Sequence, residues 1–242
     1  DNMNDSIVQL EDVYKRFGEE KVLTGLNLSV PRGETLVIMG RSGAGKSVIL
    51  KHMVGLMRPD RGRVYFDGTR LDTLKRAELQ QVRKRMGMLF QGAALFDSMT
   101  VAENVSLGLR KHTRLSESEI LEVVKAKLSA VGLSGVEEKT PAELSGGMRK
   151  RVGLARAIAM DPEYVLYDEP TTGLDPIMAD VINELIVNLR NTLSITSIAV
   201  THDIVSAYKI ADRIAMLYEG KIVFVGTPEE VKNTDNPVVR QF

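Results

Sequence analysis

The sequence predicts an α/β fold, in which a mainly parallel sheet carries helices and is interrupted by a helical insertion. Short apolar runs alternate with segments of helical spacing over 1–91 and again over 161–242, a pattern typical of parallel strands joined by right-handed crossovers. Between these parts, 92–160 has helical spacing almost throughout. A glycine-rich turn at 40–47 joins an apolar run to a helical one. We therefore expect a single domain over 1–242, with 92–160 inserted into the α/β core.

The first part of the core begins with two strands that a polar turn around Gly18 joins. Leu50, Met53 and Val54 fall on one face of the helix after the glycine-rich turn, so this helix is expected to pack on the sheet. Asp67-Gly68 is a hairpin signal. The expected strands of this part are 7–13, 22–30, 36–39, 64–66 and 86–90, and the expected helices are 48–56 and 77–84.

The inserted region contains one well-marked helix. Ser116 and Glu119 form a capping-box pattern at its start, and Gly132 stands where a C′ glycine would end it. A loop over 141–147 leads into a further helix over 148–160. The apolar face of the well-marked helix is expected to consist of Ile120, Leu121, Val124, Leu128 and Val131.

Strands and helices alternate again in the last part of the chain. The expected strands are 164–167, 197–200, 213–217 and 222–225, and the expected helices are 176–190, 204–210 and 228–231. The inward face of the helix over 176–190 is expected to consist of Ile177, Val181, Ile182, Leu185 and Leu189.

Composition narrows the class of function. Lys and Arg together number 32, as do Asp and Glu, so net charge gives no indication of nucleic-acid binding. The absence of cysteine excludes disulfides and cysteine-ligated metals, and it is compatible with a reducing compartment. No apolar run reaches the roughly 18 residues of a membrane span, and no signal peptide is visible. We expect a soluble, cytosolic chain that reaches a membrane only through a partner.

The glycine-rich turn fits the pattern G-x-x-x-x-G-K-[ST] of a phosphate-binding P-loop, and its residues are Gly40-Arg41-Ser42-Gly43-Ala44-Gly45-Lys46-Ser47. Glycines let the backbone wrap around an anion, and unpaired N–H groups at a helix start point at phosphate oxygens. Lys46 would reach the terminal phosphates, and the Ser47 hydroxyl would bind Mg²⁺. The alternative is a glycine turn with an incidental lysine, which the flanking strand and helix disfavour.

Two adjacent acids, Asp168 and Glu169, end a hydrophobic strand. Because neighbouring strand side chains point to opposite faces, the two acids can serve different purposes. One can hold Mg²⁺ together with Ser47, while the other faces an attacking water. Such a pair alone is usually a solvated turn, but the P-loop earlier in the chain favours the catalytic interpretation.

A second anion site is expected where Ser145, Gly146 and Gly147 precede a helix. The alternative is that Ser145 is simply an N-cap and the glycines form a turn. A single nucleotide cannot easily need both this site and the P-loop of one chain. Two copies arranged head to tail could each lend the second site to the other's nucleotide.

With these motifs in this order, the chain resembles the nucleotide-binding subunit of an ATP-binding-cassette (ABC) transporter over nearly its whole length. The matching motifs are Walker A at 40–47, the Q-loop at Gln91, the signature at 144–148, Walker B at 164–169, the D-loop at 173–175 and the H-loop at His202. Phe17 stands where the family places an aromatic ring that stacks on adenine. Taken alone, this aromatic residue would more often belong to a core, and the histidine to the surface.

The resemblance implies the P-loop ABC ATPase fold, with an antiparallel β subdomain and an inserted helical subdomain beside the parallel core. It also implies a role for each motif in binding and hydrolysing ATP with Mg²⁺. ATP would be held by Phe17, Gly40, Ser42, Gly43, Ala44, Gly45, Lys46, Ser47 and Val48. Mg²⁺ would be organised by Ser47, Gln91 and Asp168, while Glu169 polarises water and Lys46 and His202 contact the reacting phosphates. In a head-to-tail dimer, the site would be completed by Ser145, Gly146, Gly147, Met148 and Asp175.

Met148 departs from the glutamine that many family members carry at this place in the signature. Together with 82–86, 89–91, 94–96 and 239–242, it makes the chain similar to the ATPases of Mla and MCE-protein lipid transport systems. There the subunit works with a separate membrane permease and an MCE lipid-binding protein, often with a small STAS-domain subunit. The resemblance implies phospholipid transport, with the chain held at the cytoplasmic face of the inner membrane by its permease and no nucleic-acid partner.

Two other functions stay open at this point. A non-transport ABC ATPase, acting in translation or DNA repair, is disfavoured because the chain has one cassette, a compact insertion and no basic excess. A transporter subunit for another cargo, such as amino acids or lipoproteins, is disfavoured only by Met148 and 82–96. Four apolar residues after Gln91 form either a small local core or a groove for a permease helix, and they are Ala93, Leu95, Phe96 and Met99.

Overall fold

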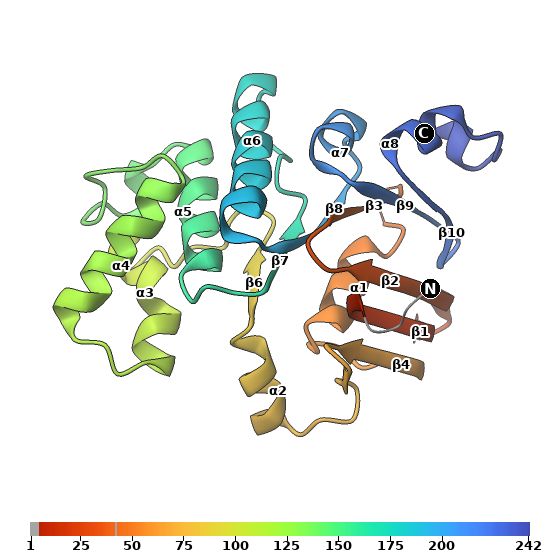
Figure 1. The fold of residues 1–242 in the computed structure, drawn as a ribbon, viewed down its shortest axis with the longest axis horizontal. Helices are drawn as coiled ribbons and strands as arrows, with labels where there is room; N and C mark the ends of the chain where they lie inside the picture. Colours follow the sequence, from red (N-terminus) through yellow and green to blue (C-terminus); the bar gives the residue numbers. More distant parts are fainter. Residues whose placement is uncertain (1–4, 42) are drawn as a thin grey trace. The chain divides into compact units, whose positions relative to one another are not determined.

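The structure is a computed structural model that describes residues 5–41 and 43–242 (Figure 1). The chain divides into two compact units, one of residues 1–82 with 196–242 and one of residues 83–195. Each unit contains parallel strands and helices, so the α/β prediction is confirmed. Among the described residues, no helix combines the length and the apolar character that crossing a membrane requires.

The first unit contains an antiparallel sheet with the strand order β2-β1-β4-β5, three strands of which lie side by side in Figure 1. Its strands are β1 (Ser6–Phe17), β2 (Glu20–Pro31), β4 (Arg61–Phe66) and β5 (Thr69–Arg70). The Asp67-Gly68 hairpin is confirmed, and both residues have a positive φ, of 48° and 78°. Positive φ at both central residues is the geometry of the tight hairpin turn that matches the twist of the strands.

Parallel strands form the other sheet of this unit, with β3 (Thr35–Met39) at its centre. It pairs in parallel with β8 (Thr196–Thr201) and β9 (Arg213–Tyr218), and β10 (Lys221–Gly226) is antiparallel to β9. All five residues of β3 are buried, as the apolar run predicts. The helices of this unit are α1 (Lys46–Met53), α7 (Ile204–Ile210) and α8 (Pro228–Asn233), with a short 3₁₀ turn at Val239–Gln241. Helix α2 (Arg76–Arg83) spans the boundary between the two units.

The second unit packs four helices around a parallel pair of strands, β6 (Met86–Leu89) and β7 (Tyr164–Asp168). The helices are α3 (Val101–His112), α4 (Glu117–Ala130), α5 (Gly146–Ile158) and α6 (Pro176–Leu193), with a 3₁₀ turn at Pro141–Glu143. Helix α5 lies so close to β6 that a Cβ on Gly87 would clash with the carbonyl oxygen of Ala157. This close approach is possible only for glycine.

Details of the inserted region differ from expectation. Residues 92–100 and 131–140 contain no helix, so helical structure is less continuous than the spacing predicts. Ser116 caps α4 by accepting from the Glu119 N–H, but the Glu119 carboxylate accepts from the Ser116 hydroxyl. A complete capping box lies at the start of α3, between Thr100 and Glu103. Gly132 ends α4 as predicted, with φ of 77°.

Two apolar side chains expected to face inward are exposed. Leu121 on α4 is exposed, and Ile177 is 77% exposed in the first turn of α6. Both predictions are wrong because helical spacing identifies one face but not how far the neighbouring elements cover it. Ile186, which the spacing analysis did not select, is buried on α6.

His52 lies fully buried on α1, the helix that begins at the P-loop. Its Nδ1 lies 2.8 Å from the carbonyl oxygen of Val48, so Nδ1 donates, while Nε2 has no hydrogen-bond partner among the described residues. Burial lowers the pKa of His52 below its usual value of 6.5, because the charged ring would lose its hydration.

This pKa shift predicts a pH-dependent stability. Below pH 6.5 the unfolded chain binds more protons than the folded chain, because His52 is protonated more readily when it is exposed to water. The free energy of unfolding therefore has its full His52-dependent part above that pH and falls as the pH decreases. His52→Gln removes the titrating imidazole, so the slope of the free energy of unfolding against pH should decrease by up to about 1.4 kcal/mol per pH unit. Urea unfolding of both proteins near pH 7.5 and near pH 5.5 measures this. Equal losses in the two proteins contradict the prediction.

Candidate functional site

The residues expected to form the site fall in both units, and each group is described within its own unit. The first unit contains Phe17, the P-loop and His202, while the second contains Gln91, the signature residues, Asp168, Glu169 and Asp175. Ser42 lies outside the described residues, so its role stays a prediction.

The P-loop turns tightly between β3 and α1. The Ala44 N–H donates to the carbonyl oxygen of Arg41 at 3.0 Å, and Gly43 and Gly45 have φ of 78° and 98°. Gly45 directly precedes α1, and a Cβ there would lie only 2.8 Å from Cγ1 of Val22. Both its backbone conformation and its close neighbour therefore require glycine at this position.

Lys46 begins α1 and is held inside this turn. It is only 6% exposed, and its ammonium group donates to the carbonyl oxygens of Gly40 at 2.5 Å and Arg41 at 3.1 Å. Ser47 follows it and is exposed. The start of α1 thus combines a glycine-rich turn, a buried lysine ammonium group and an exposed serine, which is suited to binding a phosphate chain.

The strand register places His202 at the same edge of the sheet as the P-loop. Met39 at the end of β3 is opposite Thr201 at the end of β8, so Gly40 and His202 both leave the carboxyl edge. His202 is exposed, and Asp203 beside it caps α7 and donates its N–H to the Thr201 hydroxyl at 3.0 Å. The backbone on both sides of His202 is therefore fixed.

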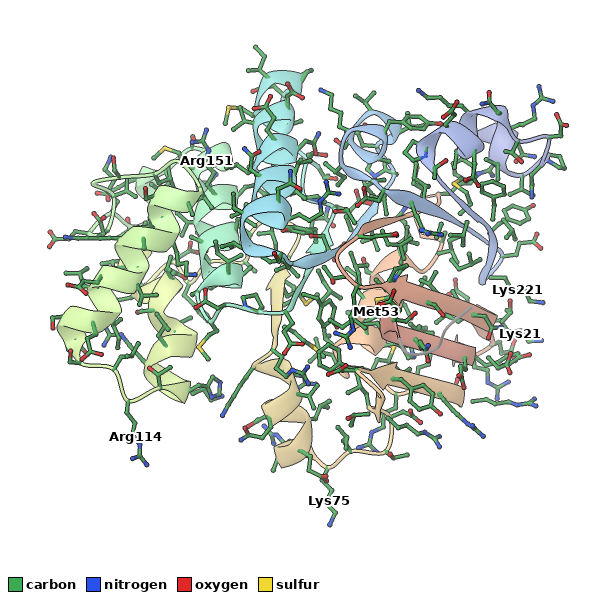
Figure 2. The ribbon with its side chains drawn as sticks, in the orientation of Figure 1. Lys21, Met53, Lys75, Arg114, Arg151 and Lys221 are labelled. Atoms are coloured by element: carbon green, nitrogen blue, oxygen red, sulfur yellow. The ribbon has the colours of Figure 1, made fainter. Side chains whose placement is uncertain are left out.

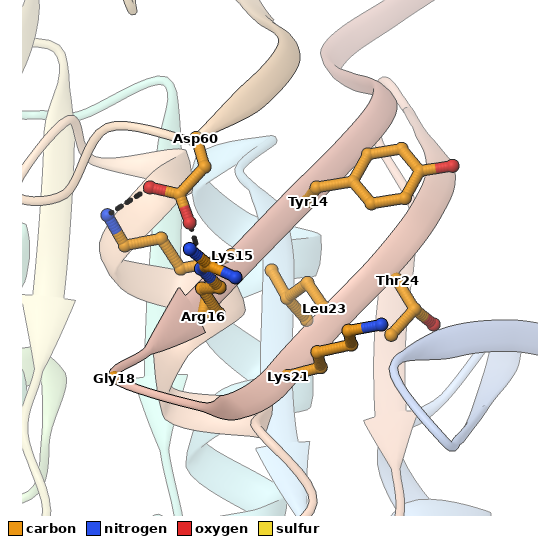
Figure 3. A pocket seen from close by; sticks show the side chains of 8 residues that line it. All are labelled: Tyr14, Lys15, Arg16, Gly18, Lys21, Leu23, Thr24 and Asp60. Atoms are coloured by element: carbon orange, nitrogen blue, oxygen red, sulfur yellow. Dashed lines mark hydrogen bonds and ion pairs between the residues drawn. The ribbon is translucent and has the colours of Figure 1, made fainter.

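Phe17 ends β1 and is 45% exposed, so it does not belong to the core. The Lys15 ammonium group lies 5.9 Å from the centre of its ring. A pocket of about 740 Å³ opens beside it, and Figure 3 shows Asp60 between Lys15 and the backbone of Arg16. Asp60 accepts from the Arg16 N–H at 2.9 Å and from Lys15 at 3.4 Å, and the pKa of Asp60 is lowered chiefly by the first of these bonds.

A second pocket, of about 610 Å³, adjoins the P-loop at Gly43 and Ala44. The turn between β9 and β10 forms its other wall, and Lys21 and Lys221, which line it, lie close together in Figure 2. This turn is tied to β2, because the Thr24 N–H donates to the carbonyl oxygen of Gly220 at 3.0 Å. The sequence predicts a turn here but gives no signal that it approaches the P-loop.

In the second unit, Asp168 is the last residue of β7 and Glu169 begins the turn after it. Glu169 has φ of 47°, which is uncommon for a residue other than glycine. Its carboxylate accepts from the Thr172 hydroxyl at 3.0 Å, and its carbonyl oxygen accepts from the Thr172 N–H at 3.3 Å. The local bonds thus fix both the backbone and the side chain of Glu169.

Lys150 on α5 also reaches this turn. Its ammonium group donates to the carbonyl oxygen of Glu169 at 3.3 Å, and the residue is only 4% exposed. Burial lowers the pKa of Lys150, while the charges of Asp168 and Glu169 act in the opposite direction. Sequence reasoning missed this residue, although a lysine at a position of the buried helix face was the signal that could have found it.

The signature forms the start of α5. Ser145 is its N-cap and accepts from the Met148 N–H at 3.2 Å, so the two glycines are the first helical residues. A Cβ on Gly147 would clash with Met178 of α6, whereas none of the described atoms lies within 4 Å of a Cβ on Gly146. Asp175 caps α6 by accepting from the Met178 N–H at 2.9 Å. The start of α5 is therefore open beside Gly146, with α6 packed against Gly147.

Gln91 is exposed and follows β6 into a loop with unusual backbone geometry. Ala93 and Ala94 have φ of 67° and 47°, and the Arg156 guanidinium donates to their carbonyl oxygens at 2.7 Å and 3.1 Å. Burial lowers the pKa of Arg156. Because Arg156 belongs to α5, the same helix carries the signature and holds the loop after Gln91.

The four apolar residues after Gln91 do not form one core. Ala93 is fully buried, Leu95 and Met99 are half-buried, and Phe96 is 52% exposed. The backbone of Phe96 is fixed by Asn104, whose amide oxygen accepts from its N–H at 2.9 Å. The segment therefore presents Phe96 to the surface from a rigid backbone.

Arg156→Lys tests how far α5 fixes this loop. Lysine keeps the charge but cannot donate to two carbonyl oxygens in the fixed geometry of a guanidinium group. We expect the free energy of unfolding to fall by about 1–3 kcal/mol and the amide hydrogens of 92–96 to exchange faster. Arg114→Lys, at an exposed position labelled in Figure 2, is the matched control and should change neither quantity. Unchanged exchange in Arg156→Lys would contradict the role of Arg156.

Known proteins are similar to this chain in sequence and in fold. The sequence profile of a family described as ABC transporter matches residues 23–172. A Mycobacterium tuberculosis protein named "Probable ribonucleotide transport ATP-binding protein mkl" is 43% identical over 97% of this chain, which spans only 66% of that relative's length. The Haemophilus influenzae "Intermembrane phospholipid transport system ATP-binding protein MlaF" is 42% identical, over 99% of this chain and 91% of its own length.

Among solved structures, a dimer of the ATP-binding cassette MJ0796 in a post-hydrolysis state, bound to ADP and Pi, has a TM-score of 0.84. It is 34% identical and covers 91% of this chain and 98% of its own. The P-loop, the Asp168-Glu169 strand end and the signature helix agree with these similarities. The chain belongs to the ABC transporter family.

Proposed function

We propose that the chain is the ATP-hydrolysing subunit of a phospholipid ABC transporter, and that it works as a head-to-tail dimer that drives a separate membrane permease. The observation that carries the proposal is the tight turn at the start of α1, where Gly45 has a positive φ and the buried Lys46 donates to the carbonyl oxygen of Gly40. Membership of the ABC transporter family gives this turn its context.

Each residue of the first unit would contribute to holding ATP. The exposed ring of Phe17 offers a face on which adenine can stack. The phosphates would lie against the N–H groups of the P-loop, and its members are Gly40, Ser42, Gly43, Ala44, Gly45, Lys46, Ser47 and Val48. Lys46 and His202 would stabilise the charge that develops on the γ-phosphate.

The residues present also suit Mg²⁺, which prefers oxygen ligands and takes only one or two carboxylates beside phosphate oxygens and water. Among the described residues, no cluster of three or more His, Cys, Asp or Glu side chains could hold a metal ion by itself. Ser47, Asp168 and Gln91 would supply oxygen atoms, and Mg²⁺ would neutralise phosphate charge. Glu169, which the Thr172 hydroxyl orients, would accept a proton from the attacking water.

A second copy would complete each site. The start of α5 is open beside Gly146 and bears no acidic side chain in its first turn, as an anion site requires. Ser145, Gly146, Gly147 and Met148 of one copy would bind the nucleotide of the other, with Asp175 beside them. The dimeric state of the MJ0796 cassette supports this arrangement.

The proposed cargo rests on similarity. The Haemophilus relative is named for intermembrane phospholipid transport and matches almost end to end, and Met148 fits the same subfamily. The proposed partners are an integral membrane permease, an MCE lipid-binding protein and a small STAS-domain subunit, and nucleic acid is not among them. The chain would lie at the cytoplasmic face of the inner membrane. Another cargo is the second candidate, because the mycobacterial relative is named for ribonucleotide transport.

Glu169→Gln tests the hydrolytic role. The amide cannot accept a proton, so ATP turnover should fall by about a hundredfold or more while ATP binding persists. Phosphate release and nucleotide binding are measured on the same preparation, in which ATP should trap a dimer. Glu163→Gln, at an exposed residue just before the same strand, is the control and should hydrolyse ATP normally. Near-normal turnover in Glu169→Gln would remove this residue from catalysis.

Phe96→Asp tests the contact with the permease. The side chain is exposed, so the substitution should spare folding and ATP binding but weaken copurification with the permease. Leu56→Asp, at another exposed apolar position, should leave the complex intact. If the Phe96→Asp complex survives, the surface around Phe96 is not the docking site. Mass spectrometry of the intact complex then tests the cargo: bound phospholipid supports the proposal, and bound ribonucleotide supports the second candidate.

A further inference from the structure

Helix α5 touches two parts of the second unit that the proposed function assigns to different nucleotides. Its first turn carries Ser145, Gly146 and Gly147, which would bind the nucleotide of the partner copy. One turn further along, Lys150 donates to the carbonyl oxygen of Glu169, which would act on the nucleotide of its own copy. Lys150 follows the N-cap Ser145 by five positions, in the same continuous helix.

A lysine is an unexpected residue at this position of the helix. Lys150 shares the buried face of α5 with Gly147, Leu154 and Ile158, where helical spacing favours an apolar side chain. Moving an ammonium group out of water is unfavourable, and the hydrogen bond to the Glu169 carbonyl oxygen together with the charges of Asp168 and Glu169 offsets only part of that cost, because burial still lowers the pKa of Lys150. Packing alone would therefore be satisfied as well, or better, by methionine.

The group that Lys150 contacts is the backbone that aims the proposed base. Glu169 has φ of 47°, a backbone conformation that residues other than glycine rarely adopt. Its carbonyl oxygen accepts from two donors. One donor is the Thr172 N–H at 3.3 Å, which is local, and the other is Lys150 at 3.3 Å, which comes from α5. A shift of α5 along its axis would therefore be transmitted to the peptide that sets the direction of the Glu169 side chain.

We propose that Lys150 is a positioning residue, which ties the orientation of Glu169 to the position of the signature helix and so couples the two nucleotide sites of the dimer. This inference rests on the proposed function. Lys150 does not touch the reacting atoms. It acts through the Glu169 backbone, so its loss should affect the rate of hydrolysis rather than the binding of ATP.

Lys150→Met is the decisive variant, because methionine fills the same space without a donor or a charge. We expect kcat for ATP hydrolysis to fall about tenfold or more, with KM for ATP unchanged within about twofold. The melting temperature should equal or exceed that of the wild type, since an apolar side chain replaces a buried charge. A residue with only a structural role would give the opposite pattern, a lower melting temperature with kcat per folded molecule unchanged.

Two further variants complete the experiment, all made in the full chain together with its copurifying permease. Lys150→Arg keeps the charge and the donor, and it should restore kcat to within about threefold of the wild type. Lys125→Met removes an exposed lysine from α4 and should change neither kcat nor stability. A wild-type kcat in Lys150→Met would overturn the inference, as would a loss that Lys150→Arg does not restore.

The same assay separates this inference from the proposed function. If Glu169→Gln is inactive while Lys150→Met is fully active, the inference fails and the proposed function stands. If the wild type itself does not hydrolyse ATP, or if Glu169→Gln matches it, the proposed function fails whatever Lys150→Met does.

Discussion

The bare backbone at the starts of two helices is the constraint on which the rest of the structure depends. In the proposed function, N–H groups at the starts of α1 and α5 bind an anion, and a side chain at Gly45 or Gly147 would meet a neighbour. At Gly45 that neighbour is Val22 of β2, and at Gly147 it is Met178 of α6. Glycine thus provides an accessible backbone and allows a second element to pack directly behind it. At each helix start, one side of the glycine is packed against a neighbouring element.

Helix α5 also combines close packing at a glycine with side chains that reach neighbouring segments. Gly153 permits close packing, since a Cβ there would lie 2.7 Å from Leu89 of β6. This approach brings Arg156 within reach of the loop after Gln91 and is continuous with the region where Lys150 reaches Glu169. The buried Lys150 and the half-buried Arg156 therefore leave one helix toward two different segments. Their desolvation is offset by carbonyl oxygens of strained backbone, which gain a charged donor in return.

Most of the fold could be predicted from the sequence, because strands buried on both faces are continuous apolar runs and glycine or proline marks their ends. Helix α7 has the predicted bounds, 204–210, and the Asp67-Gly68 hairpin forms as expected. The sequence-based predictions of burial were wrong where the packing of neighbouring elements decides whether a side chain is covered. Ile177 has an inward spacing but lies in a first helical turn that no described element covers. Lys150 and Arg156 escaped notice because a spacing analysis assigns every charged side chain to the outer face.

The contact between Met178 and Gly147 has a consequence for the chemistry of sulfur in this chain. The sequence contains no cysteine and 11 methionines, so thioethers are its only oxidisable sulfur groups. Met178 is partly exposed, and its methyl group lies against the signature glycine. Oxidation to the sulfoxide would make this side chain polar and bulkier beside the signature glycine, and a reductase could reverse the change. The packing of Met178 against Gly147 would thus expose the start of the signature helix to the effect of oxidants.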